Sequence, residues 1–104
     1  MKLFTWLKKH DVRLHAVTRA TFDPVHPEPR WRCEILGFHT PDAAHRRPAV
    51  FILTAHGLDA YVVGFGDDSD EAFGNAVNQL IGKRVRVVLY EQSRLLTVPR
   101  NLTV

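Results

Sequence analysis

The feature that most constrains the fold is a change of hydrophobic period in the second half of the chain. Within residues 72–81 the apolar side chains recur at helical spacing and form one stripe, whereas the segments on either side have the patterns of strands. The stripe predicts a helix over residues 69–81, with Gly82 placed to end it. Asp68, followed three residues later by Glu71, fits a capping box at the start of this helix. A helix enclosed by strands places the chain in the α+β class.

The predicted strands are of two types. Residues 12–22 alternate apolar with polar side chains, as a half-buried strand does. Residues 49–55 are almost continuously apolar, as in a strand that is covered on both faces. Residues 56–59 are typical of the turn of a hairpin. Strands are therefore expected at residues 12–22, 31–39, 49–55, 60–65, 83–90 and 95–98.

A short amphipathic helix is also expected within residues 1–10, which gives the element order α-β-β-β-β-α-β-β. We expect these elements to form a single compact domain over residues 1–104. Short connections favour pairing of consecutive strands, and so predict a mainly antiparallel sheet that is strongly curled or closed into a small barrel. The main helix would pack on the core of this sheet through Phe73, Val77 and Leu80.

The cysteine content and the lengths of the apolar runs exclude several classes of protein. Cys33 is the only cysteine, so neither an internal disulfide framework nor a cysteine-rich zinc module can form. No apolar run approaches the roughly 20 residues of a membrane-spanning helix. The apolar stretch at residues 3–7 is also shorter than the core of a signal peptide. We therefore expect a cytoplasmic protein with no membrane span.

The charges are distributed unevenly along the chain. The formal net charge is +3, from 14 Lys and Arg against 11 Asp and Glu. Four of the acids are Asp67, Asp68, Asp70 and Glu71, so the rest of the molecule has a balance of +7. Arg outnumbers Lys by ten to four, which favours bidentate contacts with phosphate or carboxylate groups. Such a charge pattern fits either nucleic acid or an acidic protein surface as the partner.

The arginines of the predicted strands alternate with apolar residues and so share the solvent-facing positions. If these strands are neighbours, their guanidinium groups cover one face of the sheet, with aromatic rings between them. Cations that follow a phosphate backbone, together with rings on which bases stack, are what binding of single-stranded nucleic acid requires. The candidate nucleic-acid site consists of Arg13, Arg19, Arg32, Phe38, Arg84, Arg86 and Tyr90.

Three other interpretations remain open. Arginine alternating with valine is also the ordinary pattern of the solvent face of an antiparallel sheet. The chain can instead be a protein–protein interaction module or a homodimer, in which the acidic segment 67–71 of one copy meets the basic strands of another. The third is a small hydrolase or nuclease that uses the loop histidines His39, His45 and His56. Binding rather than catalysis is the function we expect.

The sequence predicts no catalytic residues, metal site or cofactor. None of the six histidines has the spacing of a metal-binding motif. The glycines at 64 and 66 precede a helix, but the segment lacks the lysine of a phosphate-binding loop and is followed by acids that repel phosphate. Oxygens on Asp67, Ser69 and Glu71 could hold a divalent cation, although helix capping explains these residues better.

Overall fold

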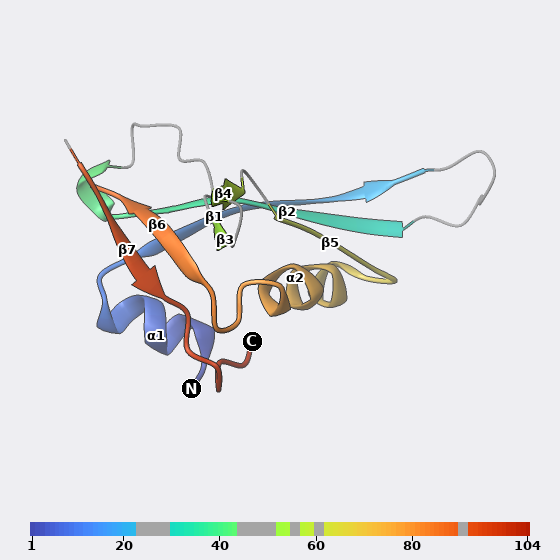
Figure 1. The fold of residues 1–104 in the computed structure, drawn as a ribbon. Helices are drawn as coiled ribbons and strands as arrows, with labels where there is room; N and C mark the ends of the chain where they lie inside the picture. The colour runs from blue at the N-terminus through green and yellow to red at the C-terminus, as the bar shows by residue number, and fades with distance from the viewer. Residues whose placement is uncertain (23–29, 44–51, 55–56, 60–61, 90–91) are drawn as a thin grey trace.

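The computed structural model describes residues 1–22, 30–43, 52–54, 57–59, 62–89 and 92–104. It shows a β-sheet with both helices on the same face, and a long β-hairpin that projects from the body of the molecule (Figure 1). The elements, in chain order, are α1 (Leu3–Lys9), β1 (Arg13–Thr21), β2 (Arg30–His39), the short 3-10 helix η1 (Pro41–Ala43), β3 (Ile52–Thr54), β4 (Gly57–Asp59), β5 (Val62–Gly66), α2 (Ser69–Asn78), β6 (Arg84–Val88) and β7 (Ser93–Thr97). In the described part of the chain, neither helix is long and apolar enough to cross a membrane.

The sheet is mixed and open, so the prediction of a mainly antiparallel, strongly curled sheet or small barrel is wrong. Five strands follow one another in the order β1-β2-β6-β3-β4, while β5 pairs with β2 and β7 pairs with β6. The parallel pair is β2 with β6, where Phe38 lies beside Val87 and His39 beside Val88. Parallel neighbours need a crossover connection, and here it contains α2. Pairing between strands so distant in the sequence is not visible in the local patterns that predicted hairpins.

Two element boundaries also differ from the prediction. Residues 57–59, expected to be a turn, form the short strand β4, so that five strands precede α2 in the described chain instead of four. Helix α2 ends at Asn78 instead of residue 81. Gly82 lies beyond the helix in the following turn, with a left-handed φ of 74°, and its N–H donates to the Val98 carbonyl at 2.9 Å.

A bulge in β2 changes which side chains face the core. Ala16 pairs with Ile35 and His15 pairs with Gly37, which leaves Leu36 as an extra residue on β2. Strict alternation would place Phe38 on the face opposite to Ile35. Because of the bulge, Phe38 instead joins Ile35 in the core, where it is 1% exposed and makes an edge-to-face contact with Trp6 of α1.

The core lies between the sheet and the two helices. Helix α1 buries Leu3, Trp6 and Leu7 against it, and α2 buries Ala72, Ala76 and Val77. Of the predicted contacts of α2, Val77 and Leu80 are buried and Phe73 is half-buried at the margin. Gly64 of β5 faces α2 at such close range that a Cβ atom there would lie 2.5 Å from the Ala72 carbonyl oxygen. The small residues of α2 and β5 therefore set how closely the helix approaches the sheet.

Candidate nucleic-acid interface

The register of the strands defines an outer face of the sheet, turned away from α1 and α2. Cys33 and Ile35 of β2 are buried toward the helices. Because side chains alternate between the two faces of a strand, Arg32 and Glu34 point to the outer face. Arg19 lies directly opposite Arg32 across the β1–β2 ladder and therefore shares this face. Two predicted arginines are thus brought together on the projecting hairpin.

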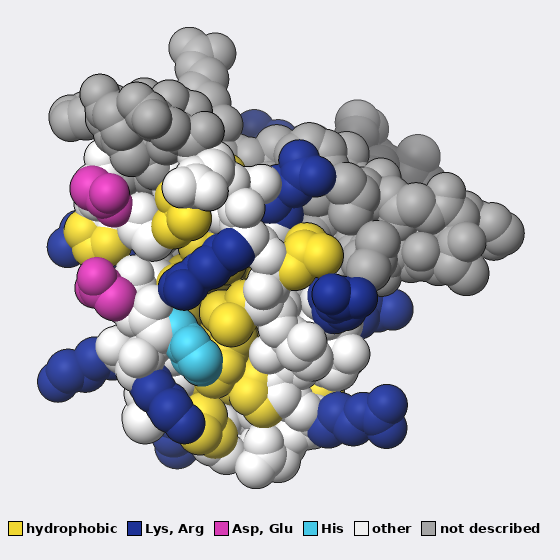
Figure 2. Space-filling view, turned by 60° about the vertical axis from the view of Figure 1, so that its left-hand side comes forward, with side chains coloured by type: hydrophobic (Ala, Val, Ile, Leu, Met, Phe, Trp, Pro, Cys, Tyr) yellow, Lys and Arg dark blue, Asp and Glu magenta, His cyan; other side chains and the backbone are white. Residues whose placement is uncertain are grey.

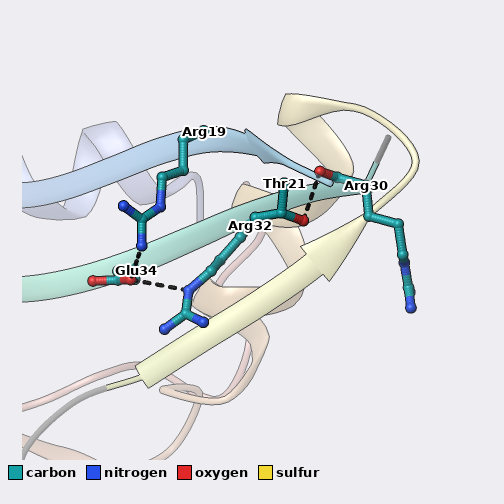
Figure 3. Close-up of polar contacts among 5 residues, drawn as sticks. All are labelled: Arg19, Thr21, Arg30, Arg32 and Glu34. Carbon is teal, nitrogen blue, oxygen red and sulfur yellow. Dashed lines mark hydrogen bonds and ion pairs between the residues drawn. The ribbon is translucent and has the colours of Figure 1, made fainter. Parts of the chain in front are cut away.

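Glu34 connects these two arginines. Its Oε1 atom accepts hydrogen bonds from Nη2 of Arg19 at 3.3 Å and from Nε of Arg32 at 2.9 Å (Figure 3). The Arg19 side chain is 62% exposed and the Glu34 side chain 21%, so Arg19 extends into solvent while the carboxylate is shielded. Like charges directly opposite each other in a sheet repel, and the shared carboxylate offsets that repulsion.

An exposed aromatic ring lies beside the same arginines. Phe65 of β5 pairs with Arg32, and the guanidinium carbons of Arg30 and Arg32 each lie 5.8 Å from the centroid of its ring. That distance is within the range of cation–π attraction. The ring is 44% exposed, although a large apolar side chain gains free energy from burial. We call this group of Arg19, Arg30, Arg32, Glu34 and Phe65 the hairpin cluster.

Three other predicted arginines lie on the outer face but away from the hairpin cluster. Arg13 pairs with His39 at the far end of the β1–β2 ladder. Arg84 and Arg86 alternate with the buried residues Val85 and Val87 of β6 and pair with β7. Strand β1 is separated from β6 by β2, so the five predicted arginines do not form one continuous patch.

Of the two aromatic residues in the predicted site, Phe38 and Tyr90, the structure describes only Phe38. Phe38 lies in the core and offers no ring surface on which a base could stack, because the bulge at Leu36 reverses its orientation. Tyr90 lies outside the described residues. Phe65 provides the exposed ring that Phe38 does not.

The acidic segment lies next to the hairpin cluster. Gly66 pairs with Trp31, so Asp67 and Asp68 directly follow the part of β5 that carries Phe65. Asp68 has the predicted capping role, and its carboxylate accepts a hydrogen bond from the Glu71 backbone N–H at 2.8 Å. Asp67, Asp70 and Glu71 are exposed. This end of the molecule thus carries neighbouring basic and acidic surfaces.

The opposite end of the molecule has a more dispersed charge pattern. Figure 2 shows Lys and Arg side chains separated from one another around a strip of apolar side chains on the side where α1, β6 and β7 lie. Arg94 of β7 donates a hydrogen bond to the His10 carbonyl oxygen at 3.1 Å, which ties β7 to the end of α1. Of the basic surfaces described, the hairpin cluster alone joins several arginines to an exposed ring.

The histidines and the cysteine form no recognisable reactive centre in the described residues. His39 is half-buried and its Nδ1 lies 2.9 Å from the Thr40 carbonyl oxygen, while His45 and His56 lie outside those residues. No group of three His, Cys, Asp or Glu side chains within the described ranges could hold a metal ion. Cys33 is fully buried.

Sequence reasoning missed Arg30 and Phe65. The sequence pattern places Arg30 just before the strand predicted at residues 31–39, and Phe65 at the end of the apolar strand predicted at residues 60–65. A signal for Phe65 was present: Gly64 and Gly66 alternate with it and mark the face where the α2 backbone approaches closely. Phe65 must then point to the other face.

Comparison of the chain with models of protein families, with curated proteins and with solved structures gives no match.

Proposed function

We propose that this protein is a non-enzymatic module that binds single-stranded or structured nucleic acid through the hairpin cluster. Arg19, Arg30 and Arg32 would contact phosphate groups, and Phe65 would stack against a base. The observation that carries the proposal is the exposed Phe65 ring with two guanidinium groups 5.8 Å from its centroid. A cytoplasmic location belongs to the same proposal, because it gives access to RNA.

The chemistry of the cluster supports binding without strong sequence preference. An aromatic face can stack on any base, and a guanidinium plane can extend the stack or contact phosphate. The three arginines less Glu34 leave a local charge of +2. The three arginines of the cluster lie on the projecting β1–β2 hairpin and Phe65 lies beside them on β5, on the face of the sheet opposite to the helices, where an extended strand of nucleic acid can reach them (Figure 1).

Fluorescence anisotropy of a labelled RNA or DNA strand of roughly 12 nucleotides tests this proposal. Phe65→Leu should weaken binding by about tenfold, because it removes one stacking contact but keeps an apolar side chain. Arg30→Gln should also weaken binding, through the loss of a phosphate contact. Arg100→Gln is the matched control, since Arg100 is exposed and lies near Gly82 at the other end of α2.

The control should bind as the wild type does. Equal affinity of Phe65→Leu and wild type would remove the stacking role. Equal losses in Arg100→Gln and Arg30→Gln would show that net charge alone, and not the cluster, governs binding.

A homodimer is the second candidate, and one specific observation favours it. The acidic segment that follows Gly66 and the arginines of β2 are neighbours on one end of the molecule. A two-fold interface pairs the same patch from both copies, so adjacent surfaces of opposite charge are self-complementary. Asp67 and Asp70 of one copy would then face the arginines of the other.

The double variant Asp67→Asn, Asp70→Asn separates the two candidates. If the protein is such a dimer, sedimentation should show a dimer in low salt that the double variant and high salt both dissociate. If the cluster binds nucleic acid, the protein should be monomeric and the double variant should bind the oligonucleotide more tightly, because two repelling charges are removed.

A further inference from the structure

Strand β1 lies at one edge of the sheet and has a partner strand on one side only. Residues 13–21 pair with β2, and no described residue forms a ladder or a backbone hydrogen bond along their other side. In an antiparallel strand about half of the residues turn their N–H and C=O groups to each side. The open edge of β1 therefore presents a row of backbone donors and acceptors, to which a further strand can be added.

The open edge of β1 differs from β5, where side chains of α2 occupy backbone groups. Asn75 donates a hydrogen bond to the Phe65 carbonyl oxygen at 2.6 Å, and Gln79 donates one to the Val63 carbonyl oxygen at 2.5 Å. Along β1, in contrast, every position from 17 to 20 is exposed. The strand is therefore accessible on both faces beside its open edge.

The outer face of β1 carries basic side chains and no acid. Arg13, His15 and Arg19 share this face, and β1 contains neither Asp nor Glu. Arg13 forms no ion pair with a described residue, while Arg19 is 62% exposed beside Glu34 of β2. Opposite charges that face each other on neighbouring strands attract, and like charges repel. A strand added at this edge is therefore favoured if its outer face carries carboxylates.

The helix side of the same edge is apolar. Leu14 and Ala16 alternate with the basic residues of β1 and line a depression of about 520 Å³, together with Phe4 of α1 and Phe73 of α2. The Phe4 residue is 68% exposed. Because the side chains of a strand alternate between its faces, every second residue of an added strand would point to this side. Aliphatic side chains there would gain free energy by covering the depression.

We propose that the open edge of β1 binds an extended segment of a partner protein in which carboxylate side chains alternate with aliphatic ones. A second copy of β1 does not meet this requirement, because it would bring Arg13, His15 and Arg19 against the same basic side chains. Cations on an edge strand thus discourage pairing between copies and leave the edge open to an acidic strand. The inference does not depend on the proposed nucleic-acid function, because the backbone of β1 holds the ligand.

Fluorescence anisotropy of a labelled, acetylated peptide, titrated with the full chain at low salt, tests the proposal. The peptide has nine residues, as many as β1, with Glu at the odd positions and Val or Leu at the even ones. We expect it to bind. A peptide with Lys in place of every Glu should bind more weakly by about tenfold or more, because its charges are repelled by the basic face of β1.

N-methylation of the peptide separates backbone pairing from charge attraction, because it removes an N–H donor and changes no charge. One peptide is methylated at two Glu residues and another at two Val residues. In an extended strand the N–H groups of these two sets point to opposite edges. One of the two peptides should therefore bind more weakly by about tenfold or more, while the other binds as the unmodified peptide does.

Variants of exposed arginines locate the peptide without disturbing the core. Arg13→Glu should weaken binding of the acidic peptide by about tenfold, because it places like charges on facing strands. Arg84→Glu is the matched control. Arg84 is exposed on the same outer face, but it lies on β6, and β2 separates β6 from β1. This control should bind the peptide as the wild type does.

Four results would overturn the proposal. The first is an absence of binding of the acidic peptide. The second is equal binding of both N-methylated peptides and the unmodified one, which would show that charge alone holds the peptide. The third is an equal effect of Arg13→Glu and Arg84→Glu. The fourth is a dimer, detected by sedimentation, that the peptide dissociates, since the edge would then belong to a second copy of the chain.

Discussion

Arg19 and Arg32 face each other across the β1–β2 ladder, and both donate hydrogen bonds to the same oxygen atom, Oε1 of Glu34. The pair is therefore held in place by a carboxylate that also reduces its positive charge. Glu34 is consequently expected to have two opposite effects: it stabilises the hairpin and weakens any interaction of the cluster with an anion.

Glu34→Gln separates these two effects. The free energy of unfolding should fall by about 1 kcal/mol, because partly exposed charge-assisted hydrogen bonds are lost and two arginines are left opposed. Oligonucleotide affinity should rise at the same time. Urea denaturation and anisotropy measure the two quantities, and Asp11→Asn is the control, since Asn tolerates the left-handed φ of 52° at that position. Lower affinity in Glu34→Gln would contradict the assignment of the cluster.

Phe38 and Phe65 should respond to truncation in very different ways. Phe38→Ala removes a ring that is 1% exposed and should cost about 3–5 kcal/mol of stability, while Phe38→Leu should cost less and still fold. Phe65→Ala should change stability by under about 1 kcal/mol, because its ring is 44% exposed. Denaturant unfolding compares the variants. Similar costs at both positions would show that Phe38 is not a core residue.

Gly64 and Gly74 form a matched pair for testing the contact between α2 and the sheet. A Cβ atom at Gly64 would lie 2.5 Å from the Ala72 carbonyl oxygen and closer still to the Ala76 nitrogen, both of them backbone atoms of α2. Gly64→Ala should therefore push the helix away and cost roughly 1–3 kcal/mol or more.

At Gly74 there is nothing within 4 Å of the added atom, so Gly74→Ala should stabilise the helix by roughly 0.5–1 kcal/mol. Thermal unfolding of both variants measures the difference. A Gly64→Ala protein as stable as Gly74→Ala would contradict the close packing of α2 on β5.

The start of α2 depends on one carboxylate. Asp68→Ala should lower the free energy of unfolding by about 1 kcal/mol, because the Glu71 N–H loses its acceptor. Asp70→Ala is the control: Asp70 is an exposed first-turn acid and is not the capping residue. It should cost only the smaller interaction of its charge with the helix dipole. Equal losses in both variants, measured by chemical denaturation, would assign the effect to charge instead of to the cap.

Local patterns in the sequence predicted the elements that depend on near neighbours. The apolar stripe and the Asp68 cap predict a helix whose end lies within one turn of the observed end of α2. The alternation from Val12 onward predicts that the side chains of Arg13 and Arg19 are exposed. Both features follow from the chemistry of adjacent residues, and the structure confirms them.

Longer-range features could not be read in the same way. The parallel pairing of β2 with β6 joins segments on opposite sides of α2, and no local pattern specifies it. The bulge at Leu36 reverses the face of Phe38; the adjacent Gly37 is compatible with a bulge but does not show which side chains change face. These two features explain why the observed site differs from the predicted one. The strand order places β2 between Arg19 and Arg86, and the bulge buries Phe38, so that Phe65 is the exposed ring instead.

The salt dependence of oligonucleotide binding tests the central claim most directly. Affinities of the wild type and of an Arg30→Gln, Arg32→Gln double variant would be measured between about 50 and 200 mM salt. If both arginines contact phosphates of a single strand, the slope of log K against log salt should be shallower in the variant by about 1.4. Oligonucleotide binding with the same slope in both proteins, or no binding by the wild type at the lower salt concentration, would contradict the account.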